Sequence, residues 1–472
     1  MHPRKGAIYA ALADMEKSVR EAQGRLTKAG SLTEYAAYAR AGESGERSVT
    51  IWTDALRKAL EENEIVRVPA AAEPYYMDGP VTIPSDRRIE AEDGAVIRLA
   101  AGVRTLLLRS EHTCDGTHRP VSGERDHNIA VVGGRWEESN DRRAGYGRTG
   151  MIDPERSYFG VSTLMFFNNM DGLLLENLTF AHTAGFSVQA GDIRNAVMRN
   201  VTFVECYADG LHINGNMENL WIRDVRGQCG DDLVALNAYD WQNSSVDFGP
   251  MRTVACENLT LSADSPCKAM RVQPGLYYYD DGSSVDCALY DVVIRGVRGI
   301  KSFKLYYQTP AYRIADGEPE RGAPGSGDWL FFEDIRMDLD SPNDGFREYL
   351  ESDPVRGRFG AFEIGSNIGH LVLEDIDLTL HRERFPLSAL IAVGPKSVLL
   401  QDGAVEVFDP YASCHVGEVA LDRIRINGRA PVMPEDFDAC LRTVEFDDIN
   451  RDGRSTGRGT VDSVTLDGER IF

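Results

Sequence analysis

The chain has 472 residues, of which 42% are hydrophobic, and its 74 acidic and 51 basic side chains give a net charge of −23. This charge argues against nucleic acid or an anionic membrane as a partner, because both require a basic protein surface. A membrane-spanning helix is also excluded, since no apolar run approaches the required length of about 20 residues.

Residues 1–48 are predicted to form an N-terminal helical segment. The opening MHPRKGAIYAALADMEKSVREAQGRL has acidic residues between its apolar ones, which is typical of an amphipathic helix and not of a secretory signal. Eight cysteines with neither a CxxC pair nor a zinc-ligand spacing favour reduced thiols. We therefore expect a cytoplasmic protein that needs no metal or other cofactor.

Residues 49–472 show one recurring strand pattern, which consists of three mostly apolar residues, a polar pair and an apolar residue. The copies are LLLENLTF (173–180), AVMRNVTF (196–203), LWIRDVRG (220–227), VACENLTL (254–261), VVIRGVRG (292–299), LFFEDIRM (330–337) and LVLEDIDL (371–378). The first two steps are 23 and 24 residues, and later steps lengthen to 34 and 38. Self-similarity at this period predicts a β-solenoid. We expect a single all-β domain, a right-handed parallel β-helix, with the N-terminal helix as a cap over its open end.

A second set of strands follows the first by about ten residues in each coil. It includes LHINGN (211–216), VALNAY (234–239), MRVQPG (270–275) and FKLYYQ (303–308). Because side chains alternate along a strand, the first and third residues should point inward and the second and fourth outward.

Stacking these strands predicts columns of polar side chains with a spacing of about 4.8 Å. The predicted columns are Asp209, Asp232, Lys268 and Lys301; His212, Ala235, Arg271, Lys304 and Glu363; and Asn214, Asn237, Gln273 and Tyr306. Asp231 lies one residue before Asp232, at the turn into its strand. The columns therefore predict a polar face with acids at one end and bases at the other.

The stacked acids Asp209, Asp231 and Asp232 point to acid/base chemistry. Carboxylates about 5 Å apart raise at least one pKa, because the second ionisation must overcome the first charge. A carboxyl group that stays protonated beside ionised ones is what cleavage of a glycosidic bond requires. The structural alternative is that Asp–Gly and Asp–Asp only form solvated turns.

The segments YADGLHI and GDDLVAL resemble the NTDG and DD motifs of glycoside hydrolase family 28, the polygalacturonases and rhamnogalacturonases. NIAVVGGRWEESN (128–140) and LMFFNNMDGLLLENLTFAHTAGFSV (164–188) are similar to coils upstream of that family's active site. The likeness covers about residues 50–310, with the catalytic coils at about 205–310. The resemblance implies that Asp231 is the general acid, that Asp209 and Asp232 hold the attacking water, and that the anomeric centre is inverted.

The chain departs from this family at several positions. Tyr207 replaces the Asn before the first catalytic Asp, and Lys268 occupies the place of a missing GHG motif. The family's RIK pair falls on Lys304 and Tyr306, or on Arg271 and Gln273 if one coil was lost.

Two interpretations of the basic residues stay open. Lys268, Arg271 and Lys304 would either bind a uronate carboxylate or act as countercharges for Asp209 and Asp232. His212 would either bind sugar hydroxyls or tune Asp209. We include Asn237 and Tyr306 with these residues in the predicted substrate-binding set.

We predict a glycoside hydrolase that acts on oligosaccharides, either pectin-like and uronate-containing or neutral. Exo-action is expected, because long loops at one corner would wall the cleft. Whether the chain forms a homo-oligomer stays open. The alternatives are a polysaccharide lyase or an epimerase on the same coil, and a carbohydrate-binding β-helix without catalysis.

Overall fold

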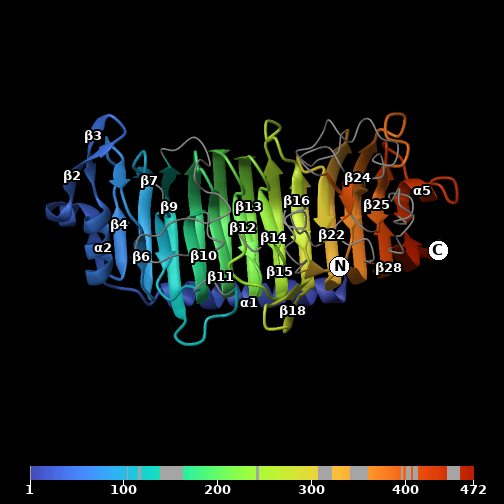
Figure 1. The fold of residues 1–472 in the computed structure, drawn as a ribbon, viewed down its shortest axis with the longest axis horizontal. Helices are drawn as coiled ribbons and strands as arrows, with labels where there is room; N and C mark the ends of the chain where they lie inside the picture. The colour runs from blue at the N-terminus through green and yellow to red at the C-terminus, as the bar shows by residue number, and fades with distance from the viewer. Residues whose placement is uncertain are drawn as a thin grey trace.

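The computed structural model describes residues 2–103, 105–114, 118–138, 163–240, 244–306, 322–340, 360–394, 397–399, 405–407, 413–443 and 458–472. In this part of the chain, strands stack into one long solenoid that advances from the N-terminal to the C-terminal end (Figure 1). Pairing between successive coils is parallel. The prediction of a parallel β-helix is therefore confirmed.

The long strands form the main file of the solenoid, each paired with the next in parallel. They are β7 (Arg87–Leu99), β9 (Asp126–Glu138), β10 (Thr163–Ala181), β11 (Phe186–Cys206), β13 (Met217–Cys229), β15 (Met251–Leu261), β19 (Leu289–Arg298), β22 (Ser326–Leu339), β24 (Asn367–Leu380), β28 (Cys414–Asp422) and β31 (Gly459–Leu466).

Short strands form a second parallel file, which includes the first halves of β10 and β11. They are β6 (Val81–Ile83), β8 (Leu108–Ser110), β12 (Leu211–Asn214), β14 (Val234–Asn237), β16 (Ala269–Gln273), β20 (Ser302–Leu305), β23 (Gly360–Ile364), β25 (Ala389–Val393) and β30 (Leu441–Thr443).

The remaining elements start, decorate or end the solenoid. β1 (Ala29–Ser31), β4 (Ile65–Val68) and β5 (Tyr75–Met77) join the first coils, and β29 (Arg425–Ile426) and α5 (Phe437–Cys440) belong to the last ones. Antiparallel pairs are β2 (Arg40–Ser44) with β3 (Arg47–Ile51), β17 (Gly275–Tyr278) with β18 (Ser284–Cys287) and β21 (Gly322–Ala323), β26 (Ser397–Leu399) with β27 (Val405–Val407), and β31 with β32 (Glu469–Arg470).

The second residue of the repeated polar pair marks a corner of each coil. In all seven copies this residue has a positive φ; these residues are Asn177, Asn200, Asp224, Asn258, Gly296, Asp334 and Asp375. Left-handed backbone strongly favours Gly, Asn and Asp, which explains the composition of the repeat. Neighbouring corners are also linked, since Asn200 Nδ2 donates to Asn177 Oδ1 at 2.8 Å.

The first residue of the polar pair forms a charged column that binds helix α1 (Pro3–Gln23). Lys5 Nζ lies 2.7 Å from both Glu333 Oε2 and Glu374 Oε2. Arg20 contacts Glu176 at 2.7 Å. As Figure 1 shows, α1 therefore runs along the flank of the solenoid. The prediction that it caps the open end is wrong.

Helix α1 lies along the flank because the outer surface of the main file carries an apolar column. The middle apolar residue of the repeat points outward, and α1 buries Leu174, Val197, Ala255, Val293 and Phe331 with its own apolar side chains. An uncovered apolar stripe of this length would be a costly exposed patch. The helix face that covers it consists of Ile8, Leu12, Met15 and Val19.

The rest of residues 1–48 is also not a helical cap. After α1 come β1, the 3₁₀ helix η1 (Leu32–Tyr38) and the β2–β3 hairpin. The N-terminal end of the core is instead closed by η1 and by α2 (Thr53–Glu62), whose Leu56 and Leu60 are buried in the main core. Among the described residues, no helix combines the length and apolar character needed to cross a membrane.

The Lys5 anchor gives a test of how α1 contributes to stability. The Lys5 side chain is 3% exposed, so Lys5→Ala leaves Glu333 and Glu374 close together without their shared cation. We expect the free energy of unfolding to fall by about 3 kcal/mol, measured by chemical denaturation. The control is Lys17→Ala on the same helix, since Lys17 is 75% exposed and should change stability by less than about 0.5 kcal/mol. Equal effects of the two variants would contradict this role for Lys5.

Candidate active site

The predicted stacking of the acid-bearing coils is confirmed by the strand register. Leu211 pairs with Val234 and Asn214 with Asn237 between β12 and β14, which is a step of 23 residues. The backbone N–H of Asp232 donates to Asp209 Oδ1 at 3.0 Å. The two acids therefore lie on adjacent coils at equivalent positions.

Asp209 is fully buried, and both of its oxygens have partners inside the protein. Besides the Asp232 N–H on Oδ1, its Oδ2 lies 2.5 Å from Nδ1 of His212. His212 Nε2 lies 3.0 Å from Asp240 Oδ2, and the imidazole ring stacks on Phe186 with centroids 3.8 Å apart. The structure thus brings His212 against Asp209, as the tuning interpretation predicted.

The histidine is held as a cation between two acids. Burial lowers the pKa of His212, but its hydrogen bonds to Asp209 and Asp240 outweigh burial and raise the pKa to about 9. At neutral pH the three side chains therefore form a buried carboxylate–imidazolium–carboxylate chain.

The connection after β14 covers this chain. The carbonyl oxygen of Ser244 accepts from Gln189 Nε2 at 3.0 Å and lies 2.9 Å from His212 Nε2. The backbone N–H of Val246 donates to Asn214 Oδ1 at 3.2 Å. His212 and Asn214 point away from the coil interior, as predicted, but this connection removes them from solvent.

Asp231 and Asp232 share one cation, Arg271. Nη2 of Arg271 lies 3.4 Å from both oxygens of Asp231, and its Nε lies 3.4 Å from Asp232 Oδ2. The countercharge interpretation of Arg271 therefore has direct contacts in the structure. The Arg271 side chain is 21% exposed and the Asp231 side chain 35%, whereas the Asp232 side chain is fully buried.

Asp231 and Asp232 differ in burial, and burial determines the pKa shift of Asp232. Burial raises the pKa of Asp232 well above its ordinary value; Arg271 opposes this shift, and the charges of Asp231 and Asp209 add to it. Arg271 is in turn held in its charged form, because the pull of the two carboxylates outweighs the cost of its burial. The pair therefore combines a buried carboxyl whose surroundings favour its protonated form with one that reaches the surface.

Cys267 also belongs to this cluster, although sequence reasoning missed it. Its Sγ lies 3.9 Å from Asp232 Oδ1, and the thiol and one oxygen each of Asp231 and Asp232 lie within 4.8 Å of one another. The register that puts Lys268 beside Asp232 also puts Cys267 beside Asp231, so the signal was present in the stacking. Sulfur and two carboxylates could hold a cation, but Arg271 already contacts both carboxylates.

The predicted substrate-binding residues differ in their exposure. Lys304 stacks on Arg271, with Glu363 on its other side in the next coil, and Lys304 is 9% exposed. Lys268 is half-buried. Asn237 and Tyr306 are buried, and Asn237 Nδ2 donates to Asp240 Oδ2 at 2.9 Å.

An open pocket of about 480 Å³ lies at the turns that precede β12 and β14. It is lined by Glu205, Cys206, Tyr207, Ala208, Gln228, Cys229, Gly230, Asp231 and Pro266. Of the three predicted catalytic acids, Asp231 is the one that reaches this pocket. Tyr207, which departs from the family motif, lines it too and is 50% exposed.

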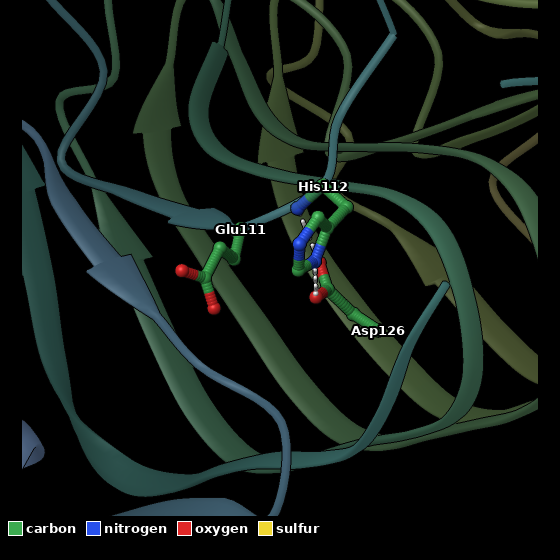
Figure 2. Close-up of side chains that lie close together, drawn as sticks. All are labelled: Glu111, His112 and Asp126. Carbon is green, nitrogen blue, oxygen red and sulfur yellow. Dashed lines mark hydrogen bonds and ion pairs between the residues drawn. The ribbon is translucent and has the colours of Figure 1, made fainter. Parts of the chain in front are cut away.

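A second cluster of metal-ligand types lies between β8 and β9 (Figure 2). His112 Nδ1 is 2.7 Å from Asp126 Oδ1, and the His112 N–H donates to Asp126 Oδ2 at 2.8 Å. These bonds use both oxygens of the fully buried Asp126, and the hydrogen bond between the side chains raises the pKa of His112. With Glu111 beside them, the arrangement fixes the chain after β8, and a cation would have to displace these bonds.

Comparison with known proteins finds similar solved structures but no family. No protein-family model and no curated protein matches the chain. A hyperthermoactive exopolygalacturonase from Thermotoga maritima is 12% identical, with a TM-score of 0.49 over 96% of both chains. A family 28 exopolygalacturonase from Yersinia enterocolitica is 11% identical, with a TM-score of 0.47 over 94% of this chain and 79% of that one.

A third similar solved structure is the catalytic unit of a GH87 α-1,3-glucanase from Streptomyces thermodiastaticus. It is 13% identical, with a TM-score of 0.43 over 94% of this chain and 71% of that one. At these identities and TM-scores the similarity carries no activity to this chain.

The buried imidazolium predicts a pH-dependent stability. Because the pKa of His212 is about 9 in the folded chain and 6.5 for an unperturbed histidine, its stabilisation is complete below pH 6.5 and is lost as pH rises through 9. The difference is on the order of 3 kcal/mol at 1.36 kcal/mol per pKa unit. We expect His212→Gln to flatten the fall in stability between pH 6.5 and 9, measured by denaturation at several pH values.

Two comparisons make this test specific. Burial also raises the pKa of Glu138, to about 8, so the wild type loses some stability over the same range for a second reason. Only the difference between wild type and variant reports His212. The control His127→Gln, at a ring 57% exposed, should leave the pH dependence unchanged. Parallel pH curves for His212→Gln and wild type would refute the imidazolium chain.

Proposed function

We propose that this chain is a glycoside hydrolase in which Asp231 and Asp232 carry out acid/base cleavage of a glycosidic bond. One observation carries the proposal: a buried carboxyl with a raised pKa lies beside a carboxyl that reaches an open pocket. Neighbouring acids whose environments push their pKa values apart are suited to divide the roles of acid and base.

The reaction can be written with a single proton on the pair, because ionising both acids would place two like charges together. Asp232 holds this proton at rest and passes it to Asp231, which reaches the pocket and gives it to the leaving oxygen as the glycosidic C–O bond breaks. A water molecule adds its oxygen to the anomeric carbon, and the proton it releases goes to Asp232, which is now ionised. The pair again holds one proton, on Asp232, as before the turnover.

Asp209 is proposed as a positioning residue. Both of its oxygens are bonded inside the protein, so it acts through the Asp232 backbone and not on the sugar. His212 neutralises its charge, which limits how far Asp209 raises the pKa of Asp232.

The stereochemical outcome has two competing predictions. The family resemblance implies inversion, which needs an acid and a base about 6.5–9.5 Å apart with a water between them. The nearest oxygens of Asp231 and Asp232 lie within 4.8 Å of each other, closer to the spacing of about 5–5.5 Å typical of retaining enzymes, in which a carboxylate and not water attacks the anomeric carbon first. NMR of the freshly released anomer decides between inversion and retention.

The proposal is tested by Asp231→Asn on a panel of uronic and neutral oligosaccharides. Loss of the general acid should lower kcat by roughly 10²–10⁴-fold on any oligosaccharide that the wild type cleaves, measured by reducing-end release. Asp224→Asn is a matched control, because Asp224 sits at a positive-φ corner where other coils have Asn. Its activity should equal that of the wild type.

Other outcomes of the same assay identify the alternatives. An unsaturated product that absorbs in the ultraviolet, with dependence on calcium, would indicate a lyase. Undiminished turnover by Asp231→Asn would remove Asp231 from the mechanism. Binding without turnover by the wild type would indicate a carbohydrate-binding β-helix. Release of mixed oligomers from a polymer would contradict exo-action.

Arg271→Gln separates the two interpretations of the basic residues. As a countercharge, Arg271 lowers the pKa of Asp232, so its removal should move the pH–rate profile to higher pH. If Arg271 instead binds a substrate carboxylate, the variant should raise KM for uronic oligosaccharides and leave the pH–rate profile in place. We expect the pH shift, because Arg271 already contacts Asp231 and Asp232.

A further inference from the structure

The pocket beside Asp231 contains an exposed aromatic ring that the proposed reaction does not use. Tyr207 is 50% exposed and lines the pocket together with Asp231. The other large hydrophobic side chains with comparable exposure among the described residues are Tyr38, Tyr278, Val432 and Phe472, and none of them lines this pocket. This exposed ring beside a candidate acid is accessible to a ligand in the pocket.

The backbone holds Tyr207 and Asp231 on adjacent coils. The Tyr207 N–H donates to the Thr183 carbonyl at 2.9 Å, and the Gly230 N–H donates to the Cys206 carbonyl at 2.8 Å. A Cβ on Gly230 would lie 1.8 Å from the Tyr207 carbonyl oxygen, so the two coils touch where only glycine fits. These backbone contacts hold the two coils together, and the side chains of Tyr207 and Asp231 both line the pocket.

The charge of this pocket differs from that of the strand face beside it. Its described lining includes the acids Glu205 and Asp231 and no Lys or Arg, while Arg271 and Lys304 lie on β16 and β20. His182 pairs with Glu205 at 3.5 Å, next to the pocket. Arg271 pairs with Asp231 from the strand face, so Glu205, whose side chain is 66% exposed, is the acid that would repel a uronate carboxylate here. A neutral sugar would not be repelled.

We infer that Tyr207 is a stacking platform for a neutral sugar ring, which binds in this pocket next to the bond that Asp231 protonates. This inference rests on the proposed hydrolase for the position of the bond, but the platform itself stands on exposure, register and charge. The tyrosine ring offers a flat apolar surface to the apolar face of a pyranose. Glu205 and Gln228 provide hydrogen-bonding groups for its hydroxyls.

The test compares Tyr207→Ala, Tyr207→Phe and Tyr38→Ala, all made in an Asp231→Asn background to prevent turnover. The ligands are neutral oligosaccharides of glucose, galactose and mannose, and oligogalacturonates of the same lengths. Calorimetry should show neutral-sugar binding weakened about tenfold by Tyr207→Ala. Tyr207→Phe should stay within about twofold of the parent, because stacking needs the ring and not the hydroxyl. Tyr38→Ala, at an equally exposed tyrosine, should have no effect.

Several results would overturn the platform: equal binding by Tyr207→Ala and its parent, equal losses in the Ala and Phe variants, preference of the Tyr207-dependent site for oligogalacturonates, or no binding of any neutral oligosaccharide. Unchanged thermal unfolding of Tyr207→Ala would show that a loss is not due to misfolding. Tyr207-dependent binding without hydrolysis by the wild type would uphold the platform and reject the hydrolase. Hydrolysis of neutral oligosaccharides with KM insensitive to Tyr207→Ala would do the reverse.

Discussion

The parallel hydrogen-bond ladder between coils is the constraint on which the rest of the structure depends. It holds every residue of one coil opposite a fixed residue of the next, as with Leu211 and Val234 or Arg271 and Lys304. A slip by one residue would turn each outward side chain into the core. The acid pair, its cation and the pocket thus follow from register, and the corners where the chain enters each strand can vary in length without moving them.

The strand register could be predicted from the sequence because local residue patterns specify it. Alternation within LHINGN and VALNAY identifies inward residues, and the repeated Asn, Asp or Gly marks a corner that needs positive φ. These signals placed Asp209 beside Asp232 and Arg271 beside Lys304 correctly. The same register also placed Cys267 beside Asp231, but a thiol without a known motif drew no prediction.

The burial of Asp209 and His212 and the course of α1 could not be predicted, because they depend on contacts between distant segments. The Ser244 carbonyl group lies against His212 although the two residues are 32 positions apart in the sequence, and no local sequence pattern indicates this contact. Lys5 reaches Glu333, 328 residues along the chain. The run of three consecutive apolar residues in each repeat was nevertheless a signal. Strict alternation would make the middle residue of the three polar, so the apolar middle residues Leu174 and Val197 on the outer surface indicate a covering element.

The electrostatics of the site follow from where water is excluded. The protein carries a net charge of −23, yet the connection after β14 buries Asp209 and Asp240 with a cation, His212, between them. Asp232 lies at the border of this ionised chain, and its own countercharge, Arg271, is shared with Asp231. Lys304, stacked on Arg271, adds a second positive charge that opposes the effect of burial on Asp232. Exclusion of water outweighs both cations and raises the pKa of Asp232 well above its ordinary value, and the coil holds this carboxyl beside Asp231, which reaches the open pocket.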